Sequence, residues 1–110
     1  MYLMSTTFVV IQFLFSLAIT DGIEPEKAII TNLQILVIDE VSGEPMPAAK
    51  IKIEQNNLEA YTDLDGLVIF NELPAGTYNI EISFISYRKQ YFKAFALNVL
   101  NNNLLVKLNQ

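Results

Sequence analysis

The stretch that decides the fold is Thr62-Asp-Leu-Asp-Gly-Leu-Val-Ile-Phe-Asn-Glu-Leu-Pro-Ala-Gly-Thr-Tyr-Asn-Ile-Glu-Ile-Ser-Phe-Ile85. It contains two turn signals, each followed by an apolar strand pattern. Residues 63–66 are typical of a tight turn in which Gly66 adopts a positive φ. Residues 73–76 are predicted as a second turn, because Pro74 presets φ at its second position and Gly76 closes it. The stretch therefore predicts two strands joined by a turn.

The residues after the second turn alternate between apolar and polar side chains. Every second position is apolar, at Tyr78, Ile80, Ile82 and Phe84. A period of two is that of a strand with one buried face and one wet face. We therefore expect these four side chains to lie in the core of an all-β domain.

The other strands are predicted over residues 29–39, 49–54, 59–62, 91–99 and 104–108. The segment 29–39 is apolar on both faces, since Leu36 and Ile38 lie opposite the face of Ile35. Such a strand is either central or shielded by a partner. The segment 91–99 alternates only weakly. About seven short strands without a helical period predict an antiparallel sandwich.

Composition excludes several classes of site. The chain has 110 residues, a net charge of −5, no Cys and no His. Disulfides, zinc sites built from thiolates or imidazoles, Ser-His-Asp triads and Cys nucleophiles are therefore excluded. An acidic chain with scattered basic residues is unsuited to nucleic acid. We expect a single domain that is not an enzyme and has no cofactor.

Residues 1–20 carry no charged side chain and include an apolar run over residues 8–19. A run of this length followed by small residues suits an export signal. No basic residue precedes the run, so an uncleaved membrane anchor and a buried first element of the fold stay open. We expect a signal or anchor over 1–20, a linker over 21–30 and the sandwich over 31–110. The domain is then exported to the periplasm, the outer-membrane surface or the extracellular space.

Three groups of residues follow an ordered pattern. They are Asp39, Gly43, Pro45, Met46 and Ala49; then Thr62, Asp63, Gly66, Phe70, Leu73, Pro74, Gly76 and Tyr78; and finally Ser86 and Tyr87. In this pattern the chain resembles the carboxypeptidase regulatory-like domains, which are transthyretin-like β-sandwiches common in exported bacterial proteins. Val68 and Ser86 depart from the family, which usually has an aromatic residue and a glycine there.

The resemblance implies a seven-stranded, antiparallel Greek-key sandwich without catalytic residues. Its structural positions are Gly43, Pro45, Gly66, Pro74, Gly76 and Tyr78. Family members usually accompany a peptidase or an outer-membrane receptor. The resemblance therefore implies a partner of that kind at the cell envelope.

A calcium loop is the alternative reading of the first turn. With Gly66 at position 6 of an EF-hand loop, the carboxylates of Asp63, Asp65 and Glu72 fall at positions 3, 5 and 12. Position 1 is Tyr61, which lacks a carboxylate, and strands rather than helices flank the loop. We favour a plain turn over a metal site.

The segment after Ile85 holds the predicted interaction surface, made of Tyr87, Arg88, Tyr91, Phe92 and Lys93. Exposed apolar patches on soluble domains tend to be interaction sites. The leading hypothesis is a non-catalytic accessory or adaptor module that acts through protein contacts at the cell envelope. The alternative is a module that binds a carbohydrate or another small ligand through these exposed aromatic side chains.

Overall fold

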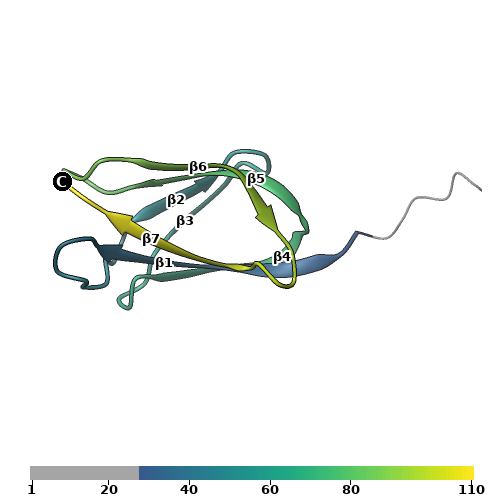
Figure 1. The fold of residues 1–110 in the computed structure, drawn as a ribbon, viewed down its shortest axis with the longest axis horizontal. Coiled ribbons are helices and arrows are strands. Elements are labelled where there is room, and N and C mark those ends of the chain that lie inside the picture. The colour runs from purple at the N-terminus through teal and green to yellow at the C-terminus, as the bar shows by residue number, and fades with distance from the viewer. Residues whose placement is uncertain (1–27) are drawn as a thin grey trace, which may run out of the picture.

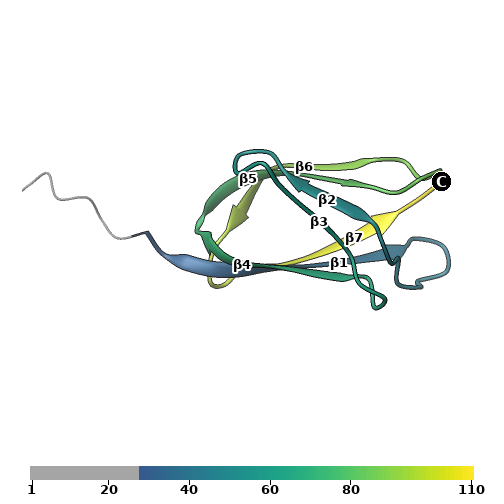
Figure 2. The same ribbon diagram turned by 180° about the vertical axis from the view of Figure 1, so that it is seen from behind.

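The computed structural model describes residues 28–110, which form seven strands in two packed sheets (Figures 1 and 2). The strands are β1 (Ile30–Asp39), β2 (Lys50–Ile53), β3 (Leu58–Tyr61), β4 (Leu67–Pro74), β5 (Gly76–Ser83), β6 (Gln90–Leu97) and β7 (Asn103–Leu108). The small sheet has the order β4-β1-β7, and the large sheet has the order β3-β2-β5-β6. Within these residues no helix is long and apolar enough to cross a membrane. The predicted signal or anchor lies outside the described residues.

The all-β prediction with seven strands is confirmed, but the purely antiparallel arrangement is wrong. Four strand pairings are antiparallel, whereas β1 and β7 pair in parallel from Gln34 opposite Asn103 to Asp39 opposite Leu108. The chain turns from β6 into β7 at the end of the molecule where β1 begins, so β7 runs alongside β1 in the same direction (Figure 1). The strands between β1 and β7 supply the long crossover that parallel pairing needs.

The core lies between the two sheets. Its fully buried side chains come from β1, β2, β5, β6 and β7: Leu33, Ile35, Val37, Ile51, Ile53, Ile80, Ile82, Leu97, Val106 and Leu108. Tyr78 is also buried, and Phe84 packs half-buried against this cluster. The period-two pattern therefore places these side chains inward as predicted.

The turn at residues 63–66 has the predicted chemistry. The Asp63 carboxylate accepts hydrogen bonds from the amides of Asp65 and Leu67, both at 2.9 Å. Gly66 has φ +76°, and a Cβ added there would lie 2.6 Å from the carbonyl oxygen of Val37. Only glycine fits this close approach of the turn to β1.

Thr62 anchors the residues before β2 to the same turn. Its side chain is buried, and its hydroxyl donates to the Met46 carbonyl at 2.5 Å and accepts from the Ala49 amide at 2.9 Å. A buried hydroxyl with both functions satisfied costs little to bury. The threonine before the turn therefore connects two loops that are distant in sequence.

The predicted turn at residues 73–76 is wrong in its extent. β4 continues through Leu73 and Pro74, which pair with Thr31 and Ile30, and the chain changes sheets at a bend at Ala75. Leu73 is buried, so it holds the strand in register instead of leaving it for a turn. Proline is tolerated because Pro74 ends an edge strand.

Two β-bulges shift the strand registers. Glu72 in β4 and Ala94 in β6 have positive φ values of 58° and 55°. The amide of Glu72 donates to the Asn32 side chain at 3.2 Å, and the amide of Ala94 donates to the Asn79 side chain at 2.9 Å. An extra residue in a strand reverses the side-chain alternation beyond it. The weak alternation of the β6 segment thus has a structural cause.

Candidate functional site

The predicted surface at residues 87–93 does not form one exposed patch. Tyr91 and Lys93 are exposed on the outer face of the large sheet, whereas Phe92 turns inward and packs against the core. The bulge at Ala94 puts Phe92 and Phe95 on the same inner face. The prediction that Phe92 is exposed is therefore wrong. The extra residue in the bulge lets two side chains three positions apart point to the same face, so Phe92 points inward with Phe95.

Tyr87 connects the two sheets instead of lying on the surface. Its hydroxyl donates to the carboxylate of Asp39 at 2.6 Å, and its ring packs edge-on against Phe84 with centroids 5.6 Å apart. The Tyr87 hydrogen bond, helped by the amides of Ser42 and Val41, lowers the pKa of Asp39 below its usual 3.8. The bond to Asp39 likewise raises the pKa of Tyr87 above 10.0.

Arg88 and the C-terminal strand lie next to this connection. The backbone amide of Arg88 donates to the Asn109 carbonyl at 2.8 Å, and the residue is exposed. Ser86 has φ +68°, a left-handed conformation at the position where the resemblance expects glycine. The segment 86–88 therefore serves as a connection between strands, and its aromatic residue is committed to Asp39.

The acidic residues of the calcium alternative do not converge. Asp63 uses its carboxylate to cap its own turn, and Glu72 lies in the β4 bulge. Across residues 28–110 there is no group of three or more acidic, His or Cys side chains placed to hold a metal ion. The turn chemistry accounts for Asp63 without a metal.

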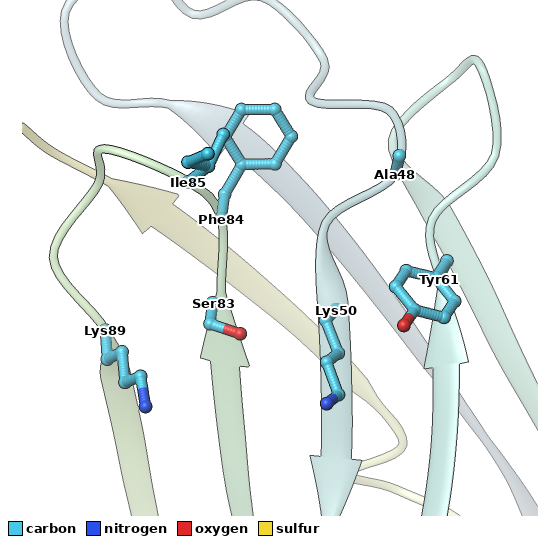
Figure 3. Close-up of a pocket in the computed structure, with 7 residues that line it drawn as sticks. All are labelled: Ala48, Lys50, Tyr61, Ser83, Phe84, Ile85 and Lys89. Carbon is cyan, nitrogen blue, oxygen red and sulfur yellow. The ribbon is translucent and has the colours of Figure 1, made fainter.

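A shallow pocket of about 410 Å³ lies at one end of the large sheet (Figure 3). Lys50, Ser83 and Lys89 lie side by side in it on neighbouring strands and loops. Lys50 pairs with Glu59 and Lys89 pairs with Glu81, each at 3.3 Å. An ion-paired ammonium group has no lone pair with which to take a proton from Ser83, so the pocket lacks an activated nucleophile.

The middle of the outer face of the small sheet is apolar, with Gln34 and Asn103 toward one end and Lys107 toward the other. Leu36 lies opposite Leu67 on one side and Leu105 on the other, so three leucines form a row across the sheet. Ile69 and Leu105 are 52% and 51% exposed. We call Leu36, Leu67, Ile69 and Leu105 the apolar face.

A hollow of about 240 Å³ adjoins this row, between β1 and β7. Gln34, Leu36, Asn103 and Leu105 contribute to its lining. The interaction surface predicted from aromatic side chains does not include these positions. The sequence signal for this face is that the segment 29–39 is apolar on both sides, as expected for a strand that is central or covered by a partner.

A model of the CarboxypepD_reg-like domain family matches residues 36–110. No curated protein matches the chain. The family match covers β2 to β7 and the last four residues of β1, so it includes strands of both sheets.

Two solved structures are similar in fold. Fervidolysin from Fervidobacterium pennivorans, a keratinolytic enzyme related to subtilisin, aligns with a TM-score of 0.64 and 18% identity over 76% of this chain. BcpA, the major pilin subunit of Bacillus cereus, aligns with a TM-score of 0.52 and 14% identity over 72% of this chain. The chain spans only 17% and 30% of these two proteins. At such identities the similarity concerns the fold alone.

Proposed function

The chain belongs to the CarboxypepD_reg-like domain family, and from this premise we propose that it is an exported, non-catalytic module that acts through protein contacts at the cell envelope. It would serve there as an accessory or adaptor domain. An outer-membrane receptor or a peptidase remains the kind of partner that the resemblance predicts.

The observation that carries the proposal is the apolar face. Along a strand with one face in water, the inward residues are normally apolar and the outward residues are normally polar. Here Leu36, Leu67 and Leu105 adjoin one another across three strands, and Leu105 is half exposed. Covering such a face releases about 25 cal/mol for each Å² of apolar surface removed from water. A contact with another protein accounts for the leucines at these positions.

The non-catalytic part of the proposal has support from side-chain chemistry. The chain contains no His and no Cys. Ser83 neighbours two ion-paired lysines, and the Asp39 carboxylate is held by Tyr87. Neither arrangement combines a nucleophile, a base that activates it and a group that stabilises the charge that develops during a reaction. Sugar binding has no comparable support, because Tyr91 and Phe92 point to opposite faces of β6.

A site-specific photo-crosslinker in living cells tests the proposal. We expect a crosslinker at Leu105 to give covalent protein adducts, and a crosslinker at Tyr91 to give none. The two positions are matched controls, since they are 51% and 56% exposed on opposite outer faces. Equal adduct formation at both positions, or none at Leu105, would contradict the contact function.

Export is tested separately in the same cells. The apolar run over residues 8–19 predicts that the chain leaves the cytoplasm. We expect a C-terminally tagged chain to be digested by protease after the outer membrane is opened. Protection until the inner membrane is also lysed would refute export and leave the contact function standing.

A further inference from the structure

We propose that the apolar face binds a second copy of this chain, around a two-fold axis that runs parallel to β1 between the two molecules. The inference rests on the proposed function in taking this face as a contact surface, and it names the partner there. Two features support it: the symmetry of the leucine row and the charges that flank it.

The leucine row is self-complementary. Leu36 lies at its centre, with Leu67 on β4 and Leu105 on β7 as its direct neighbours. A half-turn about an axis along β1 exchanges the two outer strands. Leu67 of one copy then lies over Leu105 of the other, and the two Leu36 side chains meet at the axis. A two-fold contact requires one patch that matches itself in this way.

The flanking charges favour the same axis. Lys107 lies beyond Leu105 on β7, opposite Ile38, and Asp65 lies in the turn just before Leu67. Both are exposed at the end of the face where β1 ends. The half-turn along β1 therefore brings Lys107 of one copy to Asp65 of the other, twice per dimer.

The alternative two-fold axis, perpendicular to β1, places these charges badly. It would lay β4 on β4 in opposite directions, so the acidic turn would meet the Ile69 end of the other copy. A carboxylate against an apolar side chain loses hydration without gaining a partner. Packed sheets lie about 10 Å apart, a gap that an extended lysine and an aspartate can bridge.

The two charges are available for this contact. Among residues 28–110, the ion pairs within 4.0 Å are Lys50 with Glu59 and Lys89 with Glu81, both on the large sheet. Lys107 and Asp65 take part in neither pair. Four charges of the large sheet are thus paired within one molecule, whereas Lys107 and Asp65, beside the apolar face, are complementary between two molecules.

The size of the face predicts a modest affinity. Three strands spaced about 4.8 Å apart, each contributing about six residues, give a footprint of about 300 Å² per copy, below the about 800 Å² per partner of standard interfaces, so the contact is weak and transient. We expect a dissociation constant on the order of 10 µM. The dimer would then form readily where the chain is concentrated, such as at a membrane surface.

Sedimentation of the full 110-residue chain tests the inference, with charge reversal at both positions. From about 1 to about 300 µM, we expect a monomer–dimer equilibrium. Lys107→Asp and Asp65→Lys should each weaken it about tenfold, because like charges then face each other at two sites. The double variant Asp65→Lys/Lys107→Asp should return to within about threefold of the natural chain, because the pairs are re-formed in reverse.

The remaining outcomes are decisive as well. Association that ignores all three variants arises elsewhere in the chain and overturns the inference, as does a monomer at every concentration. Both charges are exposed, so circular dichroism should show a fold unchanged by reversal. A monomeric chain whose Leu105 crosslinker still captures a different protein in cells would overturn the second copy and leave the contact function intact. A charge-dependent dimer without adducts in cells would do the reverse.

Discussion

The outer faces of the two sheets differ, although the inner faces of both sheets are lined by buried apolar side chains. On the large sheet, Lys52 lies across from Glu59 and Glu81, and the ion pairs Lys50–Glu59 and Lys89–Glu81 form between side chains of the same molecule. On the small sheet, the corresponding central positions are occupied by leucine and isoleucine. The inner faces of both sheets build the core, whereas the outer faces differ in charge: the large sheet carries ion pairs and the small sheet carries the apolar face.

This difference separates solubility from binding. Surface ion pairs add about 0.2–1 kcal/mol each, but charged side chains also keep a sheet from pairing with other chains. A leucine left half exposed adds little to the monomer and gains when a contact covers it. The proposed contact therefore rests on the apolar face, and each prediction below tests the contrast between this face and the large sheet.

The largest effect on stability is expected from Phe92→Lys, which places an ammonium group on the inner face of the large sheet, where Phe92 packs against the core. Burying an unpaired lysine should lower the free energy of unfolding by about 2 kcal/mol or more, measured by urea denaturation. Tyr91→Lys is the matched control, because Tyr91 is 56% exposed on the outer face of the same strand, and it should cost less than about 1 kcal/mol. A Phe92→Lys variant as stable as this control would show that the β6 bulge does not place Phe92 toward the core.

The next effect is on association, through Leu36→Lys. Leu36 lies at the centre of the leucine row. Substitutions at the centre of an interface usually lose the most binding free energy. We expect the dimer to weaken about 100-fold, which corresponds to about 2.7 kcal/mol. Lys52→Gln on the large sheet should change the dissociation constant by less than about threefold. Sedimentation equilibrium compares the two, and equal effects would erase the contrast between the faces.

A smaller effect concerns the connection between the sheets, through Tyr87→Phe. The lowered pKa of Asp39 adds stability above pH 3.8 that is lost as the pH falls through the folded value. The raised pKa of Tyr87 adds stability below pH 10.0 that is lost as the pH rises through the folded value. The natural chain should therefore exceed Tyr87→Phe in stability by a margin that is constant between these limits and shrinks outside them.

Thermal unfolding across the pH range measures this margin. Association should be the same in both proteins at neutral pH, because Tyr87 is not part of the apolar face. No margin at any pH would assign the contribution of Tyr87 to its ring packing on Phe84 alone, because Tyr87→Phe keeps the ring.

The smallest effect is expected from Glu59→Gln. It removes the 3.3 Å ion pair with Lys50 on the exposed face of the large sheet. The free energy of unfolding should change by less than about 0.5 kcal/mol, and the dissociation constant should not change. Denaturant titration and sedimentation check the two quantities. A loss above 1 kcal/mol would mean that the charged face stabilises the sandwich more than exposed pairs usually do.

Local chemistry made much of this fold predictable. The alternation after Gly76 places Ile80 and Ile82 in the core, and Asp63 with Gly66 makes the predicted turn. The extent of β4 was not readable, because Pro74 signals a turn locally while the burial of Leu73 keeps the strand paired. The parallel pairing of β7 depends on where the chain re-enters the small sheet, which no local pattern encodes.

The candidate site was harder to predict, for a physical reason. Whether Phe92 and Phe95 both lie inside depends on a bulge that the two residues between them, Lys93 and Ala94, do not predict. The apolar face depends on three strands brought together from distant parts of the sequence. Only the central strand carried a hint, since Leu36 and Ile38 make its second face apolar.

The most direct test of the contact at the apolar face is a crosslink at Gln34. The natural chain has no cysteine, so Gln34→Cys introduces a single thiol two residues from Leu36 on the same face. Across a two-fold axis along β1, the two thiols would lie about 10 Å apart, within reach of a short bis-maleimide. We predict covalent dimers from Gln34→Cys that disappear when Leu36→Lys is added, and none from Lys52→Cys on the large sheet. Equal yields from Gln34→Cys and Lys52→Cys, or no dimer from Gln34→Cys at concentrations well above 10 µM, would contradict the account.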